Sequence, residues 1–480
     1  MRGVSEEDSS VRVLSTCTRP LRGNKMANVE VKNWFGDIKT YPRVVVQAES
    51  VEELVGILKE SEKYPSPVRA IGSNHSTTRC GAADGGTLVK MKMNRVLRIS
   101  ENTVTAEAGA LYIDVAKELE KHGLQFYVNT EIGNLSIGSA ACAGTKNASM
   151  PEGPAGSYGW GQVGSYVTGV KMVLPSGELL TVNENEDDRL KSIRSSYGTF
   201  GVIYEATFRV RPIQPMAVYY QTFSLEDFVE KFPDLKDRGE SMMLFLFPLA
   251  NRITVGFRKY NPRARGRPNR VVWKVRNFMW KTIGPLFCCQ VAKIPSHAFR
   301  DRILDSFNAA VRFTLAYLLR SDNTVATDQI IRYPEVSDAS RYTFSLWAFP
   351  EQSYPSVLAE YFGFCQNYHK LHAYRPNMPD VGYRIAHDVQ SLLSYSFEGP
   401  VVTIDPVSTR NKGWDDFLLA YNEFCSERGG VPLLNQTCGV TRLQAEKAFQ
   451  DRLRKFAECR KIYDPNGRLL NDYFRDVLAD

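Results

Sequence analysis

Two tracts of small residues constrain this chain more than any other feature of its sequence. The first tract, Gly72 to Ser76, reads GSNHS and directly follows a strand-like apolar segment, Val68–Ile71. The second tract runs from Gly133 to Ser149. Loops of this kind present backbone N–H groups with little side-chain bulk around them, which suits them to hold phosphate oxygens. We therefore expect a domain in which two loops at strand ends hold a phosphate-bearing cofactor.

The form of these tracts disfavours two common classes of nucleotide-binding protein. No G-x-G-x-x-G sequence follows a strand and opens a helix, and no Walker A lysine motif is present. His75, inside the first tract, is a candidate metal ligand, base or point of covalent attachment. The chain has six histidines, no His-x-x-x-His pair and no carboxylate cluster near His75, so a metal site is not expected.

The length of 480 residues suggests two or three domains, and the pattern of apolar residues and glycine turns changes near residue 212. Before this point, short alternating segments and glycine turns predict an α+β domain. After it, the pattern predicts strands and two amphipathic helices, at 301–320 and 354–372. The stretch Thr441–Tyr463 predicts one further helix. We divide the chain into a flexible leader (1–32), a cofactor domain (33–212), a cap domain (213–427) and a C-terminal return to the cofactor domain (428–480).

The formal charge of +7 is unevenly distributed. Residues 241–300 contain twelve Lys and Arg and no Asp or Glu, so the remainder of the chain carries −5. Within the basic segment 252–300, residues 261–291 interleave cations with Trp, Phe, Met and Leu, a composition typical of elements that lie on anionic bilayers. We expect peripheral membrane contact here, with a solvated loop over a cap helix as the alternative. Nucleic acid is not expected, because no binding motif accompanies the charge.

Several features predict a cytoplasmic protein, associated with a membrane only at its cytoplasmic face. The nine cysteines have no regular spacing, no apolar run reaches 18 residues, and the first 26 residues lack the core of a signal peptide. Glycosylation sequons at Asn74, Asn134, Asn147 and Asn435 fall in or near the expected active site, where a glycan would obstruct function.

Four motifs together resemble the vanillyl-alcohol-oxidase-type flavoproteins, which have a PCMH-type FAD-binding domain, and among these the sugar-lactone and alditol oxidases. The motifs are Val68–Ser76, Ile137–Thr145, Gly198–Ile203 and Asp464–Tyr473. The resemblance covers residues 33–212 and 428–480 well and 213–427 loosely. It implies an α+β fold: an FAD-binding domain of two α/β subdomains, and a cap domain with an antiparallel sheet and helices.

The resemblance also implies how FAD is held. Its pyrophosphate would lie on the loop 72–77, and His75 would be bonded to the flavin 8α-methyl group, with a non-covalent hydrogen bond as the alternative. The expected cofactor-binding residues are His75, Gly72, Ser73, Asn74, Ser76, Thr77, Ser136, Gly138, Ser139, Gly144, Thr145, Gly198, Val202, Ile203 and Asn471.

The sequence departs from the pattern of the lactone and alditol oxidases at the expected catalytic face. Gln436 occupies the position of a lysine in their His-Trp-Gly-Lys motif, and Lys146 stands where these relatives have a histidine. In a comparison with decaprenylphosphoryl-ribose oxidase, three cap positions that carry polar residues there are apolar here: Phe344, Leu346 and Val401. These changes make a free polyol or aldonolactone a weaker expectation than family membership alone suggests.

The remaining polar residues around the expected flavin face are the catalytic candidates. They are Gln436, Lys146, Thr403, Tyr395 and Asn435. His387 and Asp388 form a further candidate pair for removing a hydroxyl proton.

We therefore expect an FAD-dependent oxidoreductase that transfers hydride from a C–H bond next to a hydroxyl or amine to flavin N5. Its small-molecule substrate is expected to be partly apolar or membrane-derived, with O2 as one candidate acceptor of the electrons. One alternative is a sugar-lactone or alditol oxidase. The alternative from another class is a flavin-binding scaffold protein with a degraded active site. The sequence does not indicate an oligomeric state.

Overall fold

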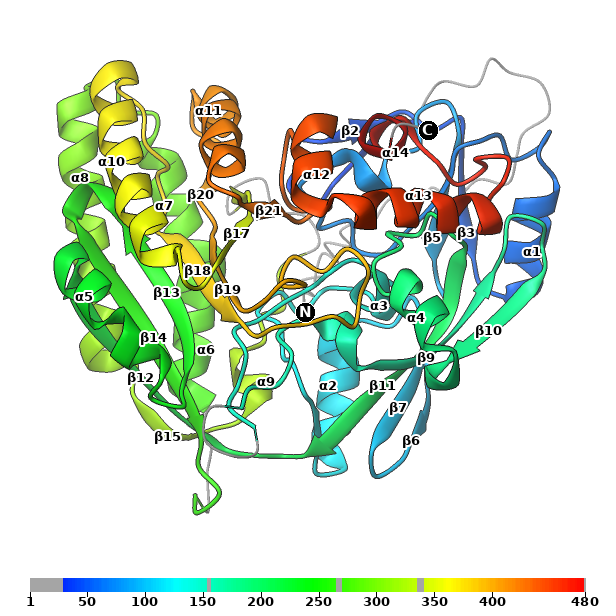
Figure 1. Cartoon of the computed structure of the whole chain (residues 1–480), viewed down its shortest axis with the longest axis horizontal. Helices are drawn as coiled ribbons and strands as arrows, with labels where there is room; N and C mark the ends of the chain where they lie inside the picture. Colours follow the sequence, from blue (N-terminus) through cyan, green and yellow to red (C-terminus); the bar gives the residue numbers. More distant parts are fainter. Residues whose placement is uncertain (1–28, 153–156, 265–269, 335–340, 479–480) are drawn as a thin grey trace, which may run out of the picture.

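The computed structural model describes residues 29–152, 157–264, 270–334 and 341–478, which form two bodies side by side (Figure 1). The first body contains the chain up to β11 and the C-terminal helices, and the second contains β12 to α11. The predicted domain boundary near 212 falls between β11, which ends at Pro212, and β12, which begins at Met216.

The first body begins with a small parallel sheet in the order β3-β5-β4. Helix α1 is capped by the Ser50 hydroxyl, which accepts from the Glu53 N–H, and it buries Leu54, Ile57 and Leu58 against this sheet. The elements are β3 (Val44–Ala48), α1 (Val51–Lys59), β4 (Val68–Ile71) and β5 (Thr87–Met91), preceded by the hairpin β1 (Val31–Lys32) and β2 (Lys39–Thr40).

A second, antiparallel sheet of the first body has the order β10-β9-β11-β7-β6, and β8 pairs with the end of β11. Its strands are β6 (Val96–Ile99), β7 (Thr103–Glu107), β8 (Leu124–Phe126), β9 (Val167–Val173), β10 (Leu179–Asn183) and β11 (Val202–Pro212). Its helices are α2 (Tyr112–Lys121), α3 (Ile137–Cys142) and α4 (Asp187–Ile193). Arg69 of β4 joins these parts, because its guanidinium donates to the carbonyls of Cys80, Tyr197, Gly198 and Leu469.

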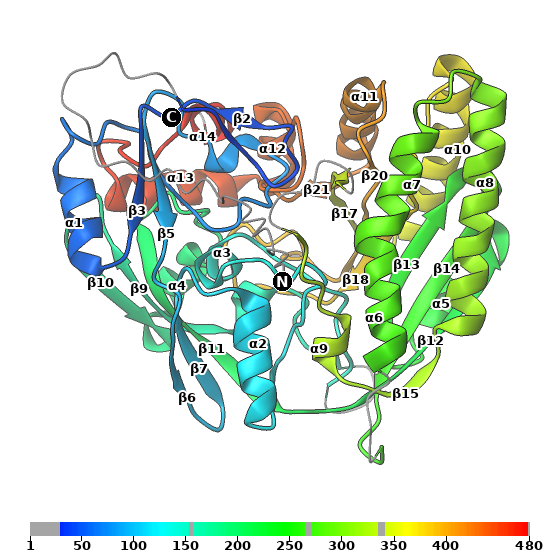
Figure 2. The ribbon, with the colours of Figure 1, turned by 180° about the vertical axis from the view of Figure 1, so that it is seen from behind.

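The second body is built on an eight-stranded sheet in the order β15-β12-β14-β13-β18-β19-β17-β21. Every residue of β13 is buried, because helices cover both faces (Figures 1 and 2). Leu244 and Leu246 share a core with α5 and α10, whereas Phe245 and Phe247 share one with α7 and α8. The strands are β12 (Met216–Ser224), β13 (Ser241–Phe247), β14 (Arg252–Tyr260), β15 (Ser321–Thr324), β17 (Trp347–Pro350), β18 (Asp380–Ile385) and β19 (Val401–Ile404).

The helices of the second body include the two that the sequence pattern predicts. The predicted helix 354–372 is α10, and the predicted helix 301–320 corresponds to α8 and a π-helical turn. Strands β16 (Thr343–Phe344) and β20 (Val407–Ser408) form a separate pair. The helices are α5 (Leu225–Lys236), α6 (Arg270–Phe278), α7 (Gly284–Val291), α8 (His297–Phe313), α9 (Ala326–Gln329), α10 (Tyr354–His372) and α11 (Trp414–Glu427).

The C-terminal segment returns to the first body, as the sequence division expects. It adds β21 (Val431–Pro432) to the edge of the second body's sheet, and α12 (Arg442–Phe449), α13 (Asp451–Tyr463) and α14 (Asp472–Leu478) follow. The prediction of one helix over 441–463 is wrong, since the chain breaks at Gln450, which has φ +50°. Phe456 of α13 packs on Phe200, whereas α12 packs on β21 and α14, so tertiary contacts override the continuous helical pattern.

Arg468 holds the C-terminal segment on the first body. Its buried guanidinium donates to the carbonyls of Ile57, Leu58 and Tyr64, around the C-terminal end of α1. The Asp464 carboxylate accepts from the N–H groups of Arg468 and Leu469, which fixes the turn that carries the arginine. Segments about 400 residues apart in the sequence are thereby held together.

We expect Arg468→Ala to lower the free energy of unfolding by at least about 3 kcal/mol, because three buried carbonyls lose their donor. Chemical denaturation monitored by circular dichroism measures this change. Arg454→Ala on α13 is the matched control, since Arg454 is 63% exposed and its ion pairs lie at the surface; its effect should stay within about 0.5 kcal/mol. Equal effects of the two substitutions would contradict the role given to Arg468.

Candidate active site

A long cleft crosses the first body where the two small-residue tracts meet. It holds about 1050 Å³ of empty space, its opening to solvent included. Most of the residues predicted to bind the cofactor line it. They are Gly72, Ser73, Asn74, His75, Ser76, Ser136, Gly138, Ser139, Thr145, Gly198, Val202 and Ile203.

The two tracts meet because glycine allows a close approach between them. A Cβ atom on Gly72 would lie 2.1 Å from the Ser136 hydroxyl oxygen, so no other residue fits at the end of β4 without displacing the second loop. Asn74 has φ +55°, and its side chain donates to the Lys32 carbonyl, which holds the loop that presents His75.

Three predicted cofactor-binding residues do not line the cleft. Thr77 is buried, and its N–H and hydroxyl donate to the carbonyls of Asn435 and Gln436. Gly144 turns the chain with φ +64° against Leu433. The Asn471 side chain donates to the carbonyls of Arg79, Cys80 and Ala82. These residues hold the walls of the cleft in place from behind, and their direct contact with the cofactor stays a prediction.

Buried polar atoms without a partner test whether the cleft suits a cofactor such as FAD. Among the described residues, His75 Nε2, Asn435 Oδ1 and Gln436 Oε1 are buried and lack a hydrogen-bond partner in the protein, and all three residues line this one cleft. A buried polar atom is costly unless it is paired, so such a group of atoms favours a ligand rich in donors and acceptors. The residues present therefore fit FAD.

His75 lies between the cleft and a small aromatic pocket. Its ring stacks on Trp34, with 4.8 Å between the ring centroids, and Tyr333 lies edge-on to it. Burial lowers the pKa of His75 to about 4, so its imidazole is neutral at pH 7. A neutral imidazole retains a lone pair, which both a covalent bond and a hydrogen bond to a cofactor require.

A second cavity, of about 620 Å³ with its opening included, continues from the cleft into the interface between the two bodies. Ile132, Leu135, Thr145 and Gln436 line both spaces, so the two are contiguous. We name the second space the substrate cavity. Its other walls are aromatic, from Trp280, Tyr342, Phe344 and Tyr383, and charged, from Glu131, Lys146 and Asp405.

Lys146 and Asp405 form a buried ion pair in the wall of this cavity. Lys146 Nζ lies 3.0 Å from Asp405 Oδ2 and 4.4 Å from the centre of the Tyr383 ring, and the two side chains are 7% and 1% exposed. Burial lowers the pKa of Lys146, while the Asp405 carboxylate acts in the opposite direction. Lys146 is therefore not a solvated surface lysine: it places an ammonium in the wall of a cavity that Gln436, the position of the lost lysine, also lines.

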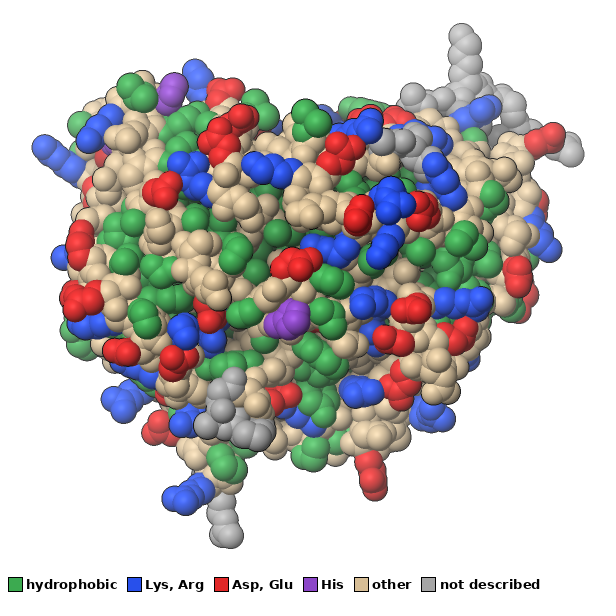
Figure 3. Space-filling view, viewed as in Figure 1, with side chains coloured by type: hydrophobic (Ala, Val, Ile, Leu, Met, Phe, Trp, Pro, Cys, Tyr) green, Lys and Arg blue, Asp and Glu red, His purple; other side chains and the backbone are tan. Residues whose placement is uncertain are grey.

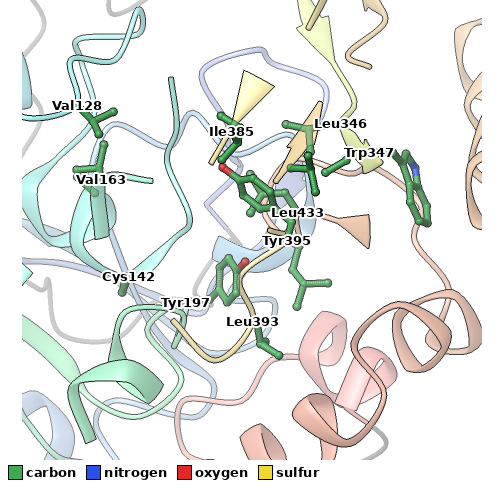
Figure 4. Packing of buried hydrophobic residues seen from close by; sticks show 14 of the residues in the cluster. Val128, Cys142, Val163, Tyr197, Leu346, Trp347, Ile385, Leu393, Tyr395 and Leu433 are labelled. Atoms are coloured by element: carbon green, nitrogen blue, oxygen red, sulfur yellow. The ribbon is translucent and has the colours of Figure 1, made fainter. Parts of the chain in front are cut away.

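Two further catalytic candidates lie away from the cavity. Thr403 is fully buried, and its hydroxyl accepts from the Tyr383 N–H, so it supports a cavity residue without lining the cavity. Tyr395 packs in the core beside Tyr197 and Leu433 (Figure 4). Neither of the two lines the cleft or the substrate cavity, whereas Asn435 lines the cleft and Gln436 lines both.

The pair His387 and Asp388 is also placed elsewhere. The Nε2–H group of His387 donates to the Phe397 carbonyl, and the buried Asp388 accepts from the hydroxyl of Ser165. Of the three positions that were interpreted as an apolar substrate surface, only Phe344 lines the cavity. Leu346 and Val401 are buried in the core, so the apolar interpretation does not hold for them.

The second body and the loop after β8 supply charged residues that are not among the candidates predicted from the sequence. Asp405 ends the apolar run of β19, and Glu131 pairs with Arg276 of α6 across the interface. Arg258 lies buried within β14, two residues before its end. The available signal was a charge within or directly after an apolar strand, which is rare unless the charge is paired or functional.

Part of the basic segment faces the interior of the protein. Trp273 is buried and donates to the Thr324 hydroxyl, and Trp280 lines the substrate cavity. Val275, Phe278 and Met279 are exposed, so membrane contact through α6 stays a prediction; residues 265–269 lie outside the described residues. Across the described ranges, no helix is both long and apolar enough to cross a bilayer. On the face in Figure 3, charges of both signs are interspersed.

Comparison with known proteins is consistent with this arrangement. The FAD binding domain model matches residues 42–183, and the D-arabinono-1,4-lactone oxidase model matches residues 206–477. L-gulonolactone oxidase of Mus musculus is 23% identical over 462 residues, covering 94% of this chain and 98% of the relative. L-gulono-1,4-lactone dehydrogenase of Mycobacterium tuberculosis is 23% identical over 454 residues, which cover 93% of this chain and 98% of the relative. The solved structure of a solvent-stable cholesterol oxidase shares the fold, with a TM-score of 0.73 and 17% identity. The match covers 94% of this chain and 98% of the cholesterol oxidase.

We expect Lys146→Met to lower the free energy of unfolding by about 3 to 5 kcal/mol, because the Asp405 carboxylate stays buried without its counter-charge. The double variant Lys146→Met/Asp405→Asn should recover most of this loss, while turnover stays low in both proteins because the ammonium is absent. Chemical denaturation and steady-state kinetics measure the two effects.

Lys171→Met removes a half-exposed lysine paired with Glu205 and is the control, with a loss below about 1 kcal/mol. If the double variant regained full turnover, Lys146 would be a structural residue only.

Proposed function

The chain belongs to the D-arabinono-1,4-lactone oxidase family and is an FAD-dependent oxidoreductase acting on CH–OH donors, and we propose that its substrate is a small polyhydroxylated ring of the aldonolactone class. The observation that supports this class is the lining of the substrate cavity. Three charged side chains and four aromatic rings surround it. Rings pack on the faces of sugars, and charged groups hydrogen-bond their hydroxyls.

FAD, when bound, supplies the acceptor for the hydride that leaves the substrate carbon. The residues that line the cleft would hold FAD, and Gln436 and Thr145 lie where the cleft meets the substrate cavity. The Lys146 ammonium has three N–H donors and uses one of them on Asp405, so it can hold a substrate oxygen with another. The carboxylates of Asp405 and Glu131 are the nearby groups able to receive a hydroxyl proton.

The alternative of a degraded scaffold rests on the missing lysine at position 436. Lys146 weakens this alternative, because it brings an ammonium to the wall of the same cavity from a different loop. Taking two charges out of water is costly, so a buried ion pair in the cavity wall is not expected in a protein whose active site is degraded.

We expect the FAD-loaded protein to oxidise aldonolactones in preference to open-chain alditols, because the aromatic walls pack on a ring, and in preference to a sterol alcohol of similar reactivity, because the cavity wall is charged. Release of hydrogen peroxide and reduction of an artificial dye, measured side by side, distinguish an oxidase from a dehydrogenase. Binding of FAD without turnover of any CH–OH donor would instead favour the scaffold alternative.

We also propose that a ring nitrogen of His75 is bonded to the flavin 8α-methyl group, a proposal that its buried, unpartnered Nε2 supports. The acid-precipitated protein should then stay yellow, and the precipitate of His75→Ala should be colourless, because its FAD is released. His122→Ala, at an exposed histidine of the first body, is the control and should give a yellow precipitate. A colourless precipitate from the unmodified protein would show that the contact is non-covalent.

A further inference from the structure

A third cavity lies beyond the substrate cavity, on the side away from the cofactor cleft. It holds about 380 Å³, its opening included, and Arg258, Arg276, Tyr220, Asn147 and Gln329 line it. Glu131 lines both this space and the substrate cavity, whereas no residue lines both this space and the cleft. The three spaces therefore follow one another in the order cleft, substrate cavity and third cavity.

Arg258 is the residue that sets this third cavity apart. It is 7% exposed, and its two hydrogen bonds go to amide oxygens: one of 3.0 Å to Asn147 Oδ1 and one of 3.5 Å to Gln329 Oε1. Its Nε has no partner among the described residues. The buried Arg468, by comparison, donates to three carbonyls and a hydroxyl. A guanidinium has five N–H donors, so Arg258 keeps unused donors at the cavity wall.

The charges around the two inner cavities do not balance. Lys146 pairs with Asp405, and Arg276 pairs with Glu131. Arg258 has no carboxylate within ion-pair distance in the described part of the chain, which leaves three cations against two anions around these cavities. An unpaired charge away from water is costly, and burial accordingly lowers the pKa of Arg258. The site therefore carries one positive charge in excess.

We propose that the third cavity is a subsite for a carboxylate carried by the substrate, at the end remote from the carbon that is oxidised. This inference rests on the proposed function, because it adds an anionic group to a substrate of the aldonolactone class. Arg258 binds the carboxylate with its free N–H groups, and Arg276, which is paired with Glu131, also lines the cavity. A carboxylate can accept two of the guanidinium N–H groups at once.

The first test measures anion binding without turnover. Acetate, inorganic phosphate and neutral glycerol are added separately to the FAD-loaded protein at constant ionic strength. Acetate should raise the melting temperature by about 2 °C at ten times its dissociation constant, and glycerol at the same concentration should not. A larger shift with phosphate than with acetate would overturn the choice of a carboxylate, and no shift with either anion would overturn the subsite.

Two variants locate the binding site. Arg258→Gln removes the cation, whereas Gln329→Glu supplies a negative charge next to Arg258 with hardly any change of shape. Both should abolish the shift with acetate, and Gln329→Glu keeps the test valid if Arg258→Gln does not fold. Arg252→Gln, at the exposed start of the same strand, is the control and should keep the shift. A shift that persists in Gln329→Glu would place the anion elsewhere and overturn the proposal.

The second test uses a pair of substrates that differ in a single group. The monolactone of an aldaric acid carries a carboxylate where the aldonolactone carries a terminal hydroxymethyl group. The carboxylate should raise kcat/KM at least about tenfold in the unmodified protein and not in Arg258→Gln or Gln329→Glu. Equal kcat/KM values for the two lactones would overturn the subsite. Failure to oxidise either lactone, with the acetate shift intact, would instead count against the proposed function.

Discussion

The active site depends on buried charges that face each other across the interface between the two bodies. Lys146 of the first body meets Asp405 of the second, and Glu131 of the first meets Arg276 of the second. A buried charge without its partner destabilises the protein by several kcal/mol, so separating the two bodies at this surface is unfavourable for both. The same pairs that join the bodies thereby line the space between them with charge, which makes the substrate cavity polar although its neighbourhood is a hydrophobic core.

This arrangement explains how the site tolerates a neutral amide at position 436. The turn that carries Asn435 and Gln436 is held by Thr77, whose N–H and hydroxyl donate to their carbonyls. The amide side chains of the turn are left free to face the cleft, and the positive charge comes from Lys146 on the opposite loop. The cavity can therefore contain an ammonium group although the motif position has no lysine.

Much of the fold was predictable, because local patterns and tertiary contacts agree along most of the chain. The glycine tract after β4 and the helix α10 follow directly from residue spacing. The break at Gln450 did not, since its residues have a continuous helical period and only packing against Phe200, β21 and α14 separates α12 from α13. The placement of Thr403 outside the cavity lining was not predictable for a related reason, because a strand residue faces the cavity or the core according to a register that the sequence alone does not reveal.

By itself, the sequence determined the cofactor cleft, since the contacts of small loops with phosphates come from the backbone and need only glycine, serine and their spacing. It also determined that an unusual number of cations lies in one segment of the second body. Tertiary structure alone decided what those cations do. Arg276 and Arg258 are far in the chain from Glu131 and Asn147, and they meet them only when the sheet of the second body packs on the loop after β8. The composition fixes how many charged residues the segment has. Whether each of them is solvated, paired or free to bind a ligand depends on which surfaces exclude water around it.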